Sequence, residues 1–375
     1  MASITLEHVN KTYVSEGKQV EAVRDLSLEI HDGEFVCLLG PSGCGKTSTL
    51  RMIAGLEDIS GGEILSNDLV VNNLSPQERN IAMAFETYAL YTHLSVRDNI
   101  LFPLRARRVP KDEMERRLAV VVEMLDIADI LDRSPGNLSG GQQQRVSLGR
   151  AIIRQPGVFL LDEPLSHLDV SQRIVLRARI KRLHAELKTT MIYVTHDQEE
   201  AISLADRIAV MQFAELQQVG TREDLLDAPE NLFVADFIGE PPINLLRWNL
   251  EQTNGHVALK SPTADCQIVL PDAWKDYLSK NNIKKLVLGI RPHDIRLTEN
   301  PGDARLNGVV DVFEFLGEIN YVHCAVGSDL VTVVADADTF FSRGERVAMY
   351  VRPDRVHIFD AETEKCISSV LKRGA

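Results

Sequence analysis

The sequence lacks the marks of a secreted or membrane-spanning chain. Its first ten residues, MASITLEHVN, have neither a basic start nor an apolar core, so we expect no signal peptide. No uncharged apolar run approaches the length of a membrane span. The five cysteines are scattered singly, which gives no metal-binding spacing and favours a reducing cytoplasm over a disulfide framework.

Positive charge and coiled-coil repeats are also scarce. There are 41 Lys and Arg residues against 54 Asp and Glu, a formal net charge of −13, and such an acidic chain is a poor partner for nucleic acid or anionic lipid. No heptad stretch predicts a coiled coil. The 375 residues, 44% of them hydrophobic, suffice for two or three domains with full cores.

What the sequence has is a phosphate-binding loop. Phe35–Leu39 is a continuous apolar run that predicts a strand buried on both faces. It leads into GPSGCGKT, whose spacing fits G-x-x-x-x-G-K-[ST], and a helix is predicted over Thr47–Ala54. Glycines let backbone N–H groups wrap phosphates, and the helix adds its positive end. The predicted nucleotide contacts here are Pro41, Ser42, Gly43, Cys44, Gly45, Lys46, Thr47 and Ser48.

Two of these side chains have specific roles in such a loop. Lys46 is expected to reach the β- and γ-phosphates, and the Thr47 hydroxyl to ligate Mg²⁺. A second apolar strand, Val158–Leu161, runs into Asp162 and Glu163. Asp162 suits a second anchor for Mg²⁺, and Glu163 suits polarising an attacking water. On its own this acidic turn would equally fit a solvated loop, but beside a phosphate loop the catalytic interpretation is favoured.

A third apolar strand, Met191–Val194, ends at Thr195 and His196. If it belongs to the same sheet, neutral imidazole at His196 can hold the γ-phosphate and the water together.

Five short motifs, taken in their order, resemble the ATP-binding cassette of ABC transporters: GPSGCGKT, LSGGQQQR, FLLDEP, SHLD and VTHD. The resemblance covers roughly Ile4 to Gly239. It implies an α/β P-loop fold with a parallel-sheet core, an antiparallel β subdomain and a helical subdomain at about 86–155. It also implies ATP and Mg²⁺ as cofactors, and two ATP molecules held between facing subunits. Tyr13 resembles the aromatic that stacks on adenine, with strand packing as the alternative.

The string LSGGQQQR resembles the signature that contacts the γ-phosphate of ATP held by the partner subunit. A helix predicted over Gln142–Ile153 would follow two glycines and present bare backbone donors at its start. SHLD resembles the loop that crosses the dimer interface. The predicted contacts from these segments are Ser139, Gly140, Gly141, Gln142 and Asp169.

Two positions depart from the family's pattern. Glu86 stands where the family normally carries Gln, which touches Mg²⁺ and the water and links the site to the membrane subunits. A carboxylate can ligate Mg²⁺, repel the γ-phosphate if unligated, or substitute silently. His167 stands in place of the usual Asn, as a titratable group near the interface or as a change without consequence. Both leave room for a non-identical ATPase partner, with a homodimer as the simpler default.

The family resemblance implies that a short cytoplasmic helix of the membrane subunit docks on the helical subdomain and on the loop Phe85–His93. In Arg116–Leu125 the apolar residues fall at helical spacing. Local packing is the alternative for each candidate contact in the loop. These candidates are Tyr88, Leu90, Tyr91 and Leu94.

The Gly-Glu-Pro-Pro at 239–242 predicts a boundary between a cassette domain, 1–239, and a second domain, 240–375. Beyond it, short alternating runs predict a small all-β domain. It resembles the C-terminal oligonucleotide/oligosaccharide-fold domain of sugar-importer ATPases of the maltose, glycerol-phosphate and polyol type. In that family this domain mainly pairs two copies of the ATPase subunit. Four aromatics are expected in its core or in an interface: Trp248, Trp274, Phe313 and Phe315.

We therefore expect the energy-coupling ATPase of an importer for a carbohydrate, polyol or sugar-phosphate, peripheral on the cytoplasmic face of a bacterial inner membrane. The expected partners are a second ATPase subunit, identical or a paralogue, two transmembrane permease subunits and, indirectly, a solute-binding protein, without nucleic acid. The alternatives are import of polyamine, ferric iron or sulfate, a soluble cassette acting on nucleic acid or ribosomes, and a regulator that sequesters a transcription factor.

Overall fold

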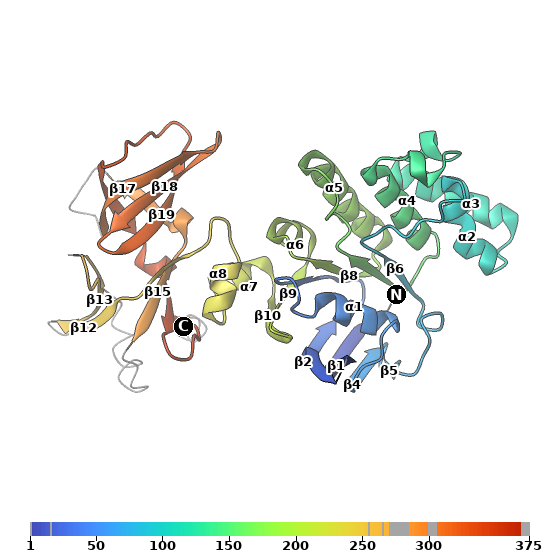
Figure 1. Cartoon of the computed structure of the whole chain (residues 1–375), viewed down its shortest axis with the longest axis horizontal. Coiled ribbons are helices and arrows are strands. Elements are labelled where there is room, and N and C mark those ends of the chain that lie inside the picture. Colours follow the sequence, from blue (N-terminus) through green and yellow to red (C-terminus); the bar gives the residue numbers. More distant parts are fainter. Residues whose placement is uncertain are drawn as a thin grey trace. The chain divides into compact units, whose positions relative to one another are not determined.

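The structure is a computed structural model that describes residues 2–15, 17–253, 256–264, 266–269, 285–298 and 306–368 (Figure 1). It contains two compact units, Met1–Arg222 and Glu223–Ala375. The first unit ends before the boundary predicted at Gly239, because the helix that precedes this glycine is bonded to the second unit. Leu232 N donates to Glu364 O, and the Arg291 guanidinium donates to Ile238 O.

The first unit is built on a six-stranded sheet of order β10-β9-β3-β8-β7-β6, parallel from β9 to β6. Every residue of β3, β7 and β8 is buried, as predicted for strands covered on both faces. Because parallel strands end at one edge, Leu39, Asp162 and Thr195 finish side by side. The strands are β3 (Phe35–Leu39), β6 (Ile81–Ala84), β7 (Val158–Asp162), β8 (Thr190–Thr195), β9 (Arg207–Gln212) and β10 (Glu215–Gly220).

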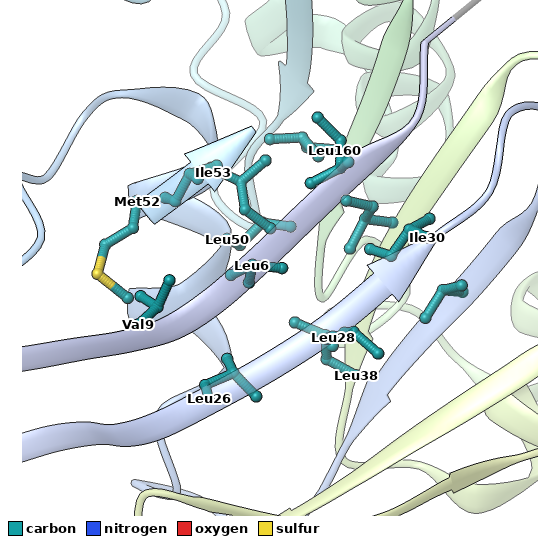
Figure 2. Close-up of a cluster of buried hydrophobic side chains, with 14 of the residues drawn as sticks. Leu6, Val9, Leu26, Leu28, Ile30, Leu38, Leu50, Met52, Ile53 and Leu160 are labelled. Atoms are coloured by element: carbon teal, nitrogen blue, oxygen red, sulfur yellow. The ribbon is translucent and has the colours of Figure 1, made fainter. Parts of the chain in front are cut away.

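A second, antiparallel sheet of order β2-β1-β4-β5 packs beneath the first, with α1 (Lys46–Ala54) between them (Figure 1). Its strands are β1 (Ile4–Ser15), β2 (Lys18–Ile30), β4 (Gly61–Ser66) and β5 (Leu69–Val70). Figure 2 shows their shared core, in which Leu6 and Leu28 of the antiparallel sheet meet Leu38 of β3, Leu50 of α1 and Leu160 of β7. This apolar filling fixes α1, and with it the phosphate loop, against the carboxyl ends of the parallel strands.

The helical part lies between β6 and β7 in sequence. In α3 the predicted apolar face is buried through Leu118, Val121 and Leu125. Its helices are α2 (Val96–Ala106), α3 (Lys111–Leu125) and α4 (Gly140–Ile152), with short 3₁₀ turns at Ala128–Ile130 and Pro135–Asn137. Two more helices follow, α5 (Val170–Leu187) and α6 (Gln198–Leu204), on the side of the parallel sheet opposite α1 (Figure 1). Among the described residues, no helix is both long and apolar enough to cross a membrane.

The second unit begins with two short helices, α7 (Arg222–Asp227) and α8 (Leu232–Phe237), and continues in strands. A three-stranded sheet joins β11 (Asn244–Leu246), β15 (Leu286–Ile290) and β21 (His357–Asp360), and another joins β12 (Asn249–Thr253), β13 (His256–Lys260) and β14 (Gln267–Val269). The third sheet has the order β16-β20-β17-β18-β19, with β16 (Ile295–Thr298), β20 (Arg346–Val351), β17 (Leu306–Phe315), β18 (Ile319–Val326) and β19 (Asp329–Asp336). The repeated Arg-Pro pairs each open a 3₁₀ turn, Pro292–Asp294 and Pro353–Arg355.

The four predicted core or interface aromatics of this unit have different environments. Trp248 is buried in the core, and its indole N–H donates to Asp329. Phe313 packs against the same core, whereas Phe315 is 59% exposed. Trp274 lies outside the described residues.

Candidate nucleotide site

At Gly45 the phosphate loop adopts a backbone conformation that favours glycine. Gly45 ends the loop with φ +104°, and a Cβ added there would lie 2.2 Å from Ala22 O. Lys46 then begins α1, and its ammonium group is buried within the loop. It donates to Gly40 O at 2.7 Å and to Pro41 O at 3.0 Å. The loop therefore presents the positive end of α1 together with a cation, which suits a phosphate chain.

The far end of α1 is held by a residue that the sequence analysis missed. Arg79 is 8% exposed, and its guanidinium donates to four carbonyl oxygens. Two of them, Met52 O at 2.7 Å and Ile53 O at 3.0 Å, belong to the last turn of α1; Leu74 O and Asn72 O accept at 3.0 Å each. Burial lowers the pKa of this guanidinium. A cation at this end complements the helix dipole and orients the phosphate-facing end.

The two predicted Mg²⁺ anchors are already in contact. The Thr47 hydroxyl donates to Asp162 Oδ1 at 3.1 Å. Burial raises the pKa of the Asp162 carboxyl, the Thr47 hydrogen bond lowers it, and the charges of Glu163 and Glu86 raise it. No group of three or more His, Cys, Asp or Glu in the described part of the chain could hold a metal ion by itself. One hydroxyl and one carboxylate suit Mg²⁺, which takes its other oxygens from phosphates and water.

The two predicted catalytic side chains meet at the same edge. His196 Nδ1 lies 3.1 Å from Glu163 Oε2, and Glu163 N donates to Val194 O at 3.0 Å, which ties the ends of β7 and β8 together. Glu163 has φ +42°, a left-handed backbone that is rare outside glycine. Its side chain is 21% exposed and that of His196 is 56% exposed. The pair is accessible, as a general base and its partner must be.

A buried carboxylate fixes the strand that carries His196. Glu200 is 4% exposed and accepts hydrogen bonds at 2.8 Å from Tyr193 and Thr195, both in β8. Burial raises the pKa of Glu200, and the two hydrogen bonds oppose that rise. In sequence this glutamate is one of several acidic residues in an amphipathic stretch, so only the fold reveals its place.

Tyr13 lies beside the start of α1. Its hydroxyl donates to Ser48 Oγ at 3.2 Å, and Lys11 Nζ lies 4.7 Å from the ring centre. This places an aromatic face at the mouth of the phosphate loop, and its stacking on adenine stays a prediction.

The signature segment forms a capped helix start. The Ser139 hydroxyl accepts from Gln142 N at 3.3 Å, while the Gln142 side chain accepts from Ser139 N at 3.0 Å. A Cβ added at Gly141 would lie 2.8 Å from Gln172 Oε1, and one at Gly140 would lie 3.5 Å from the Tyr88 hydroxyl. Within the described part of this chain, no hydrogen bond joins Ser139–Gln142 to the phosphate loop.

Asp169 also serves as a helix cap. Its carboxylate accepts from Gln172 N at 2.9 Å and from the Ser171 hydroxyl at 2.7 Å at the start of α5. These bonds lower the pKa of Asp169, the Ser171 bond most. Its role at the nucleotide stays a prediction. Glu86, the last predicted site residue, lies with its Oε1 3.4 Å from His167 Nε2.

Comparisons with known proteins identify the family. Residues 23–166 match the ABC transporter family, and residues 288–359 match the TOBE domain family. The xylose/arabinose import ATP-binding protein XacK of Haloferax volcanii is 46% identical over 97% of this chain and 94% of its own length. The trehalose/maltose import ATP-binding protein MalK of Thermococcus litoralis is 44% identical over 98% of this chain and its own full length.

A solved structure shares the fold of the cassette. The dimeric structure of MJ0796, a bacterial ABC transporter cassette, has a TM-score of 0.53 and 29% identity, and covers 58% of this chain and 98% of its own. A second structure of MJ0796, with the same TM-score and coverage, is a dimer bound to ADP and phosphate. The predicted fold class and family are confirmed. The chain thus belongs to the ATP-binding proteins of ABC transporters, carries a TOBE domain, and is an ATPase.

Proposed function

We propose that this ATPase drives the import of a carbohydrate, polyol or sugar-phosphate through separate membrane subunits. The observation that carries the solute class is the similarity, over almost the whole chain, to two proteins named for sugar import. The peripheral position would be on the cytoplasmic face of the membrane, where ATP is supplied. A solute-binding protein would deliver the solute to the membrane subunits.

Two cassettes would close on two ATP molecules. Lys46 of one chain and the Ser139 helix start of its partner would hold the phosphates from opposite sides, with Asp169 at the interface. Pairing is supported by the dimeric structures of the similar cassette MJ0796 and by the capped helix start at Ser139. Closure is driven by ATP binding better to the closed state than to the open one, and it would turn the membrane subunits outward.

Hydrolysis would then reset the pair. Mg²⁺, when bound, would neutralise phosphate charge, held by Thr47 and Asp162 with Glu86 as a third oxygen donor. Glu163 would orient and deprotonate the attacking water, and His196 would keep that water and the γ-phosphate in register. The 3.1 Å contact between Glu163 and His196 supports this division of work.

The catalytic assignment is tested by Glu163→Gln. This variant should bind ATP and form a stable dimer but hydrolyse ATP at least about a hundredfold more slowly, because general base catalysis contributes roughly 10²–10⁴. Glu186→Gln, a change on the exposed part of α5, is the control and should hydrolyse normally. Normal turnover by Glu163→Gln would refute the assigned role.

A groove next to the loop Phe85–His93 supports docking of a membrane subunit. It has a volume of about 660 Å³ and combines aromatic and cationic side chains. Tyr91 and Phe102 stack in it at 4.7 Å between ring centres. Of the four predicted loop contacts, Tyr91 lines the groove, whereas Tyr88 packs against His167. The groove lining includes Phe85, Tyr91, Phe102, Arg107, Arg150 and Arg154.

The cationic side chains of the groove indicate the charge of the segment that would dock there. Burial lowers the pKa of Arg154, and the nearby Arg107 lowers it further. In the described part of the chain, neither arginine forms an ion pair. Two neighbouring cations without a carboxylate favour a docking segment that carries apolar residues and at least one acidic side chain.

The second unit supports pairing of two copies through an apolar patch, defined by Val312, Phe315, Leu316 and Phe340. These side chains are 45–67% exposed, and Phe315 stacks on Phe340 with ring centres 6.0 Å apart. Patches of this kind mark protein contacts more often than free surface.

The transport proposal is tested by a mild-detergent pull-down of the tagged chain from its native membranes. We expect two membrane subunits and two copies of this chain. A different cassette protein in equal amount would indicate a non-identical pair, and absence of any membrane chain would refute the transport role. Screening the neighbouring solute-binding protein with sugars, polyols, polyamines, ferric iron and sulfate decides the solute class.

A further inference from the structure

Two side chains that depart from the family's pattern contact each other. Glu86 lies in the loop 85–93 and His167 in the loop 166–169, yet Glu86 Oε1 lies 3.4 Å from His167 Nε2. The side chains are 46% and 55% exposed, so both are accessible from solvent. The two loops therefore share a polar contact within one cassette.

His167 is also held by packing. Its ring meets Tyr88 edge to face, with ring centres 6.4 Å apart and planes at 86°. Tyr88 has φ +58°, and its carbonyl accepts from the Ser147 hydroxyl at 3.1 Å and from Arg150 at 2.9 Å. Ser147 and Arg150 belong to α4, the helix that begins with the signature. His167 is thus connected through Tyr88 to the element that is proposed to meet the partner's ATP.

The contact between Glu86 and His167 lies among other acidic side chains. Asp162, Glu163 and Glu86 are three acidic groups close to one phosphate site; burial is the main cause that raises the pKa of Asp162, and the charges of Glu163 and Glu86 add to that rise. A third carboxylate without a partner would repel both Asp162 and a phosphate. Nε2 of His167 faces the Glu86 carboxylate at 3.4 Å, which is within ion-pair distance, so the ring supplies a polar partner to that carboxylate.

We propose that His167 is a positioning residue for Glu86, and that the two act as one unit linking the loop 85–93 to the interface loop 166–169. This inference rests on the proposed closure of two cassettes on ATP. It explains both departures within a single chain, without a second kind of ATPase subunit. Removing the histidine takes away the contact that holds Glu86 against the loop 166–169, and removing both groups restores a neutral arrangement.

The test is a double-mutant cycle on ATP-dependent dimerisation of the full chain, measured by sedimentation in the slow-hydrolysing Glu163→Gln background. His167→Ala, which removes the donor altogether, should weaken dimerisation about fivefold when Glu86 is present, the upper end of what an exposed ion pair contributes. In the Glu86→Gln variant the same histidine change should alter dimerisation by less than about twofold. His167→Gln, which keeps an N–H donor, should dimerise within about twofold of the background protein.

A matched control pair lies elsewhere on the surface. His31 Nδ1 is 3.4 Å from Glu29 Oε1, with side chains 63% and 66% exposed. A cycle with His31→Ala and Glu29→Gln should show no coupling in dimerisation. The magnesium-ATP affinity of each variant, read with a fluorescent ATP analogue, should follow the same pattern as dimerisation.

The outcomes separate the two proposals. If the chain with the native Glu163 hydrolyses ATP and the Glu163→Gln background dimerises, but the His167 and Glu86 effects simply multiply, the positioning role is overturned while the transport role stands. If the background protein does not dimerise with ATP, the closure mechanism itself fails, and the inference fails with it. Thermal unfolding of each variant identifies any that is not folded, in which case His167→Gln decides the question.

Discussion

Arg79 offers a quantitative test of how the phosphate loop is supported. Arg79→Met keeps most of the side-chain volume but removes the guanidinium that donates to Met52 O, Ile53 O, Leu74 O and Asn72 O. Each hydrogen bond to a charged group contributes roughly 1.5–3 kcal/mol. The sum overstates the effect, because burial of the guanidinium, visible in its lowered pKa, opposes folding. A loss of about 3–5 kcal/mol is expected, since carbonyl oxygens are left buried without a donor.

For a unit of this size each kcal/mol shifts the melting temperature by about 2–4 °C, so Arg79→Met should melt roughly 6–20 °C lower. The assay is differential scanning calorimetry of the full chain, following the transition that ATP shifts, because that transition belongs to the nucleotide-binding unit. Arg79→Lys, which keeps the charge but not the planar fork, should fall in between. Arg182→Met is the control, because its side chain is 82% exposed and its pair with Glu186 is worth little. Equal melting of Arg79→Met and Arg182→Met would refute the account of α1 support.

Three further predictions concern the loop, a buried acid and the β domain. Gly45→Ala should weaken ATP binding at least about tenfold, because of the positive φ and the 2.2 Å approach to Ala22 O, whereas Gly136→Ala, with nothing within 4 Å, should bind normally; a fluorescent ATP titration decides. The pKa of Glu200 is raised from 4.5 by burial, so the folded state holds its proton more tightly, and the stability that this proton confers is lost as pH rises from 4.5 through the raised pKa. The free energy of unfolding in urea should therefore rise for Glu200→Gln relative to the native chain as the pH increases. A difference that does not change with pH would contradict this. Phe315→Ser should weaken nucleotide-free pairing of the chain in sedimentation without changing ATP binding, and an unchanged association constant would remove the apolar patch from the interface.

The placement of the site's polar side chains could be predicted because its parts are local in sequence. Asp162 ends β7, Glu163 follows it directly, and His196 directly follows β8, while Thr47 lies in the first turn of the helix after the loop that follows β3. Parallel strands bring such positions to one edge, which explains the Thr47–Asp162 and Glu163–His196 contacts. The parallel core, the antiparallel sheet and the all-β second unit could be predicted in the same way, from periodicity together with the family resemblance.

The supporting residues could not be predicted, because their roles depend on contacts between distant segments. Arg79 lies in a polar stretch with no helical or strand pattern, and nothing local shows that it reaches the end of α1. Glu86 and His167 each depart from a pattern, but only the fold shows that they touch. The boundary differs for the same reason: the Gly-Glu-Pro-Pro marks a break in regular structure, whereas the packing of α8 depends on the strand end near Glu364.

The strand order also determines when the nucleotide site can form during synthesis. In the part of the chain that the structure describes, β3, which leads into the phosphate loop, pairs with β8 and β9, and both strands come late in the first unit, before β10. At about 5–20 residues per second, the ribosome needs roughly 8–35 s to add the chain between residue 39 and residue 207. During this interval the loop exists without its neighbouring strands, so ATP has no folded site to bind on the nascent chain. Cellular ATP can therefore stabilise only the last step of folding of this unit, and a ribosome stalled before β8 should display a chain whose protease sensitivity does not change with nucleotide.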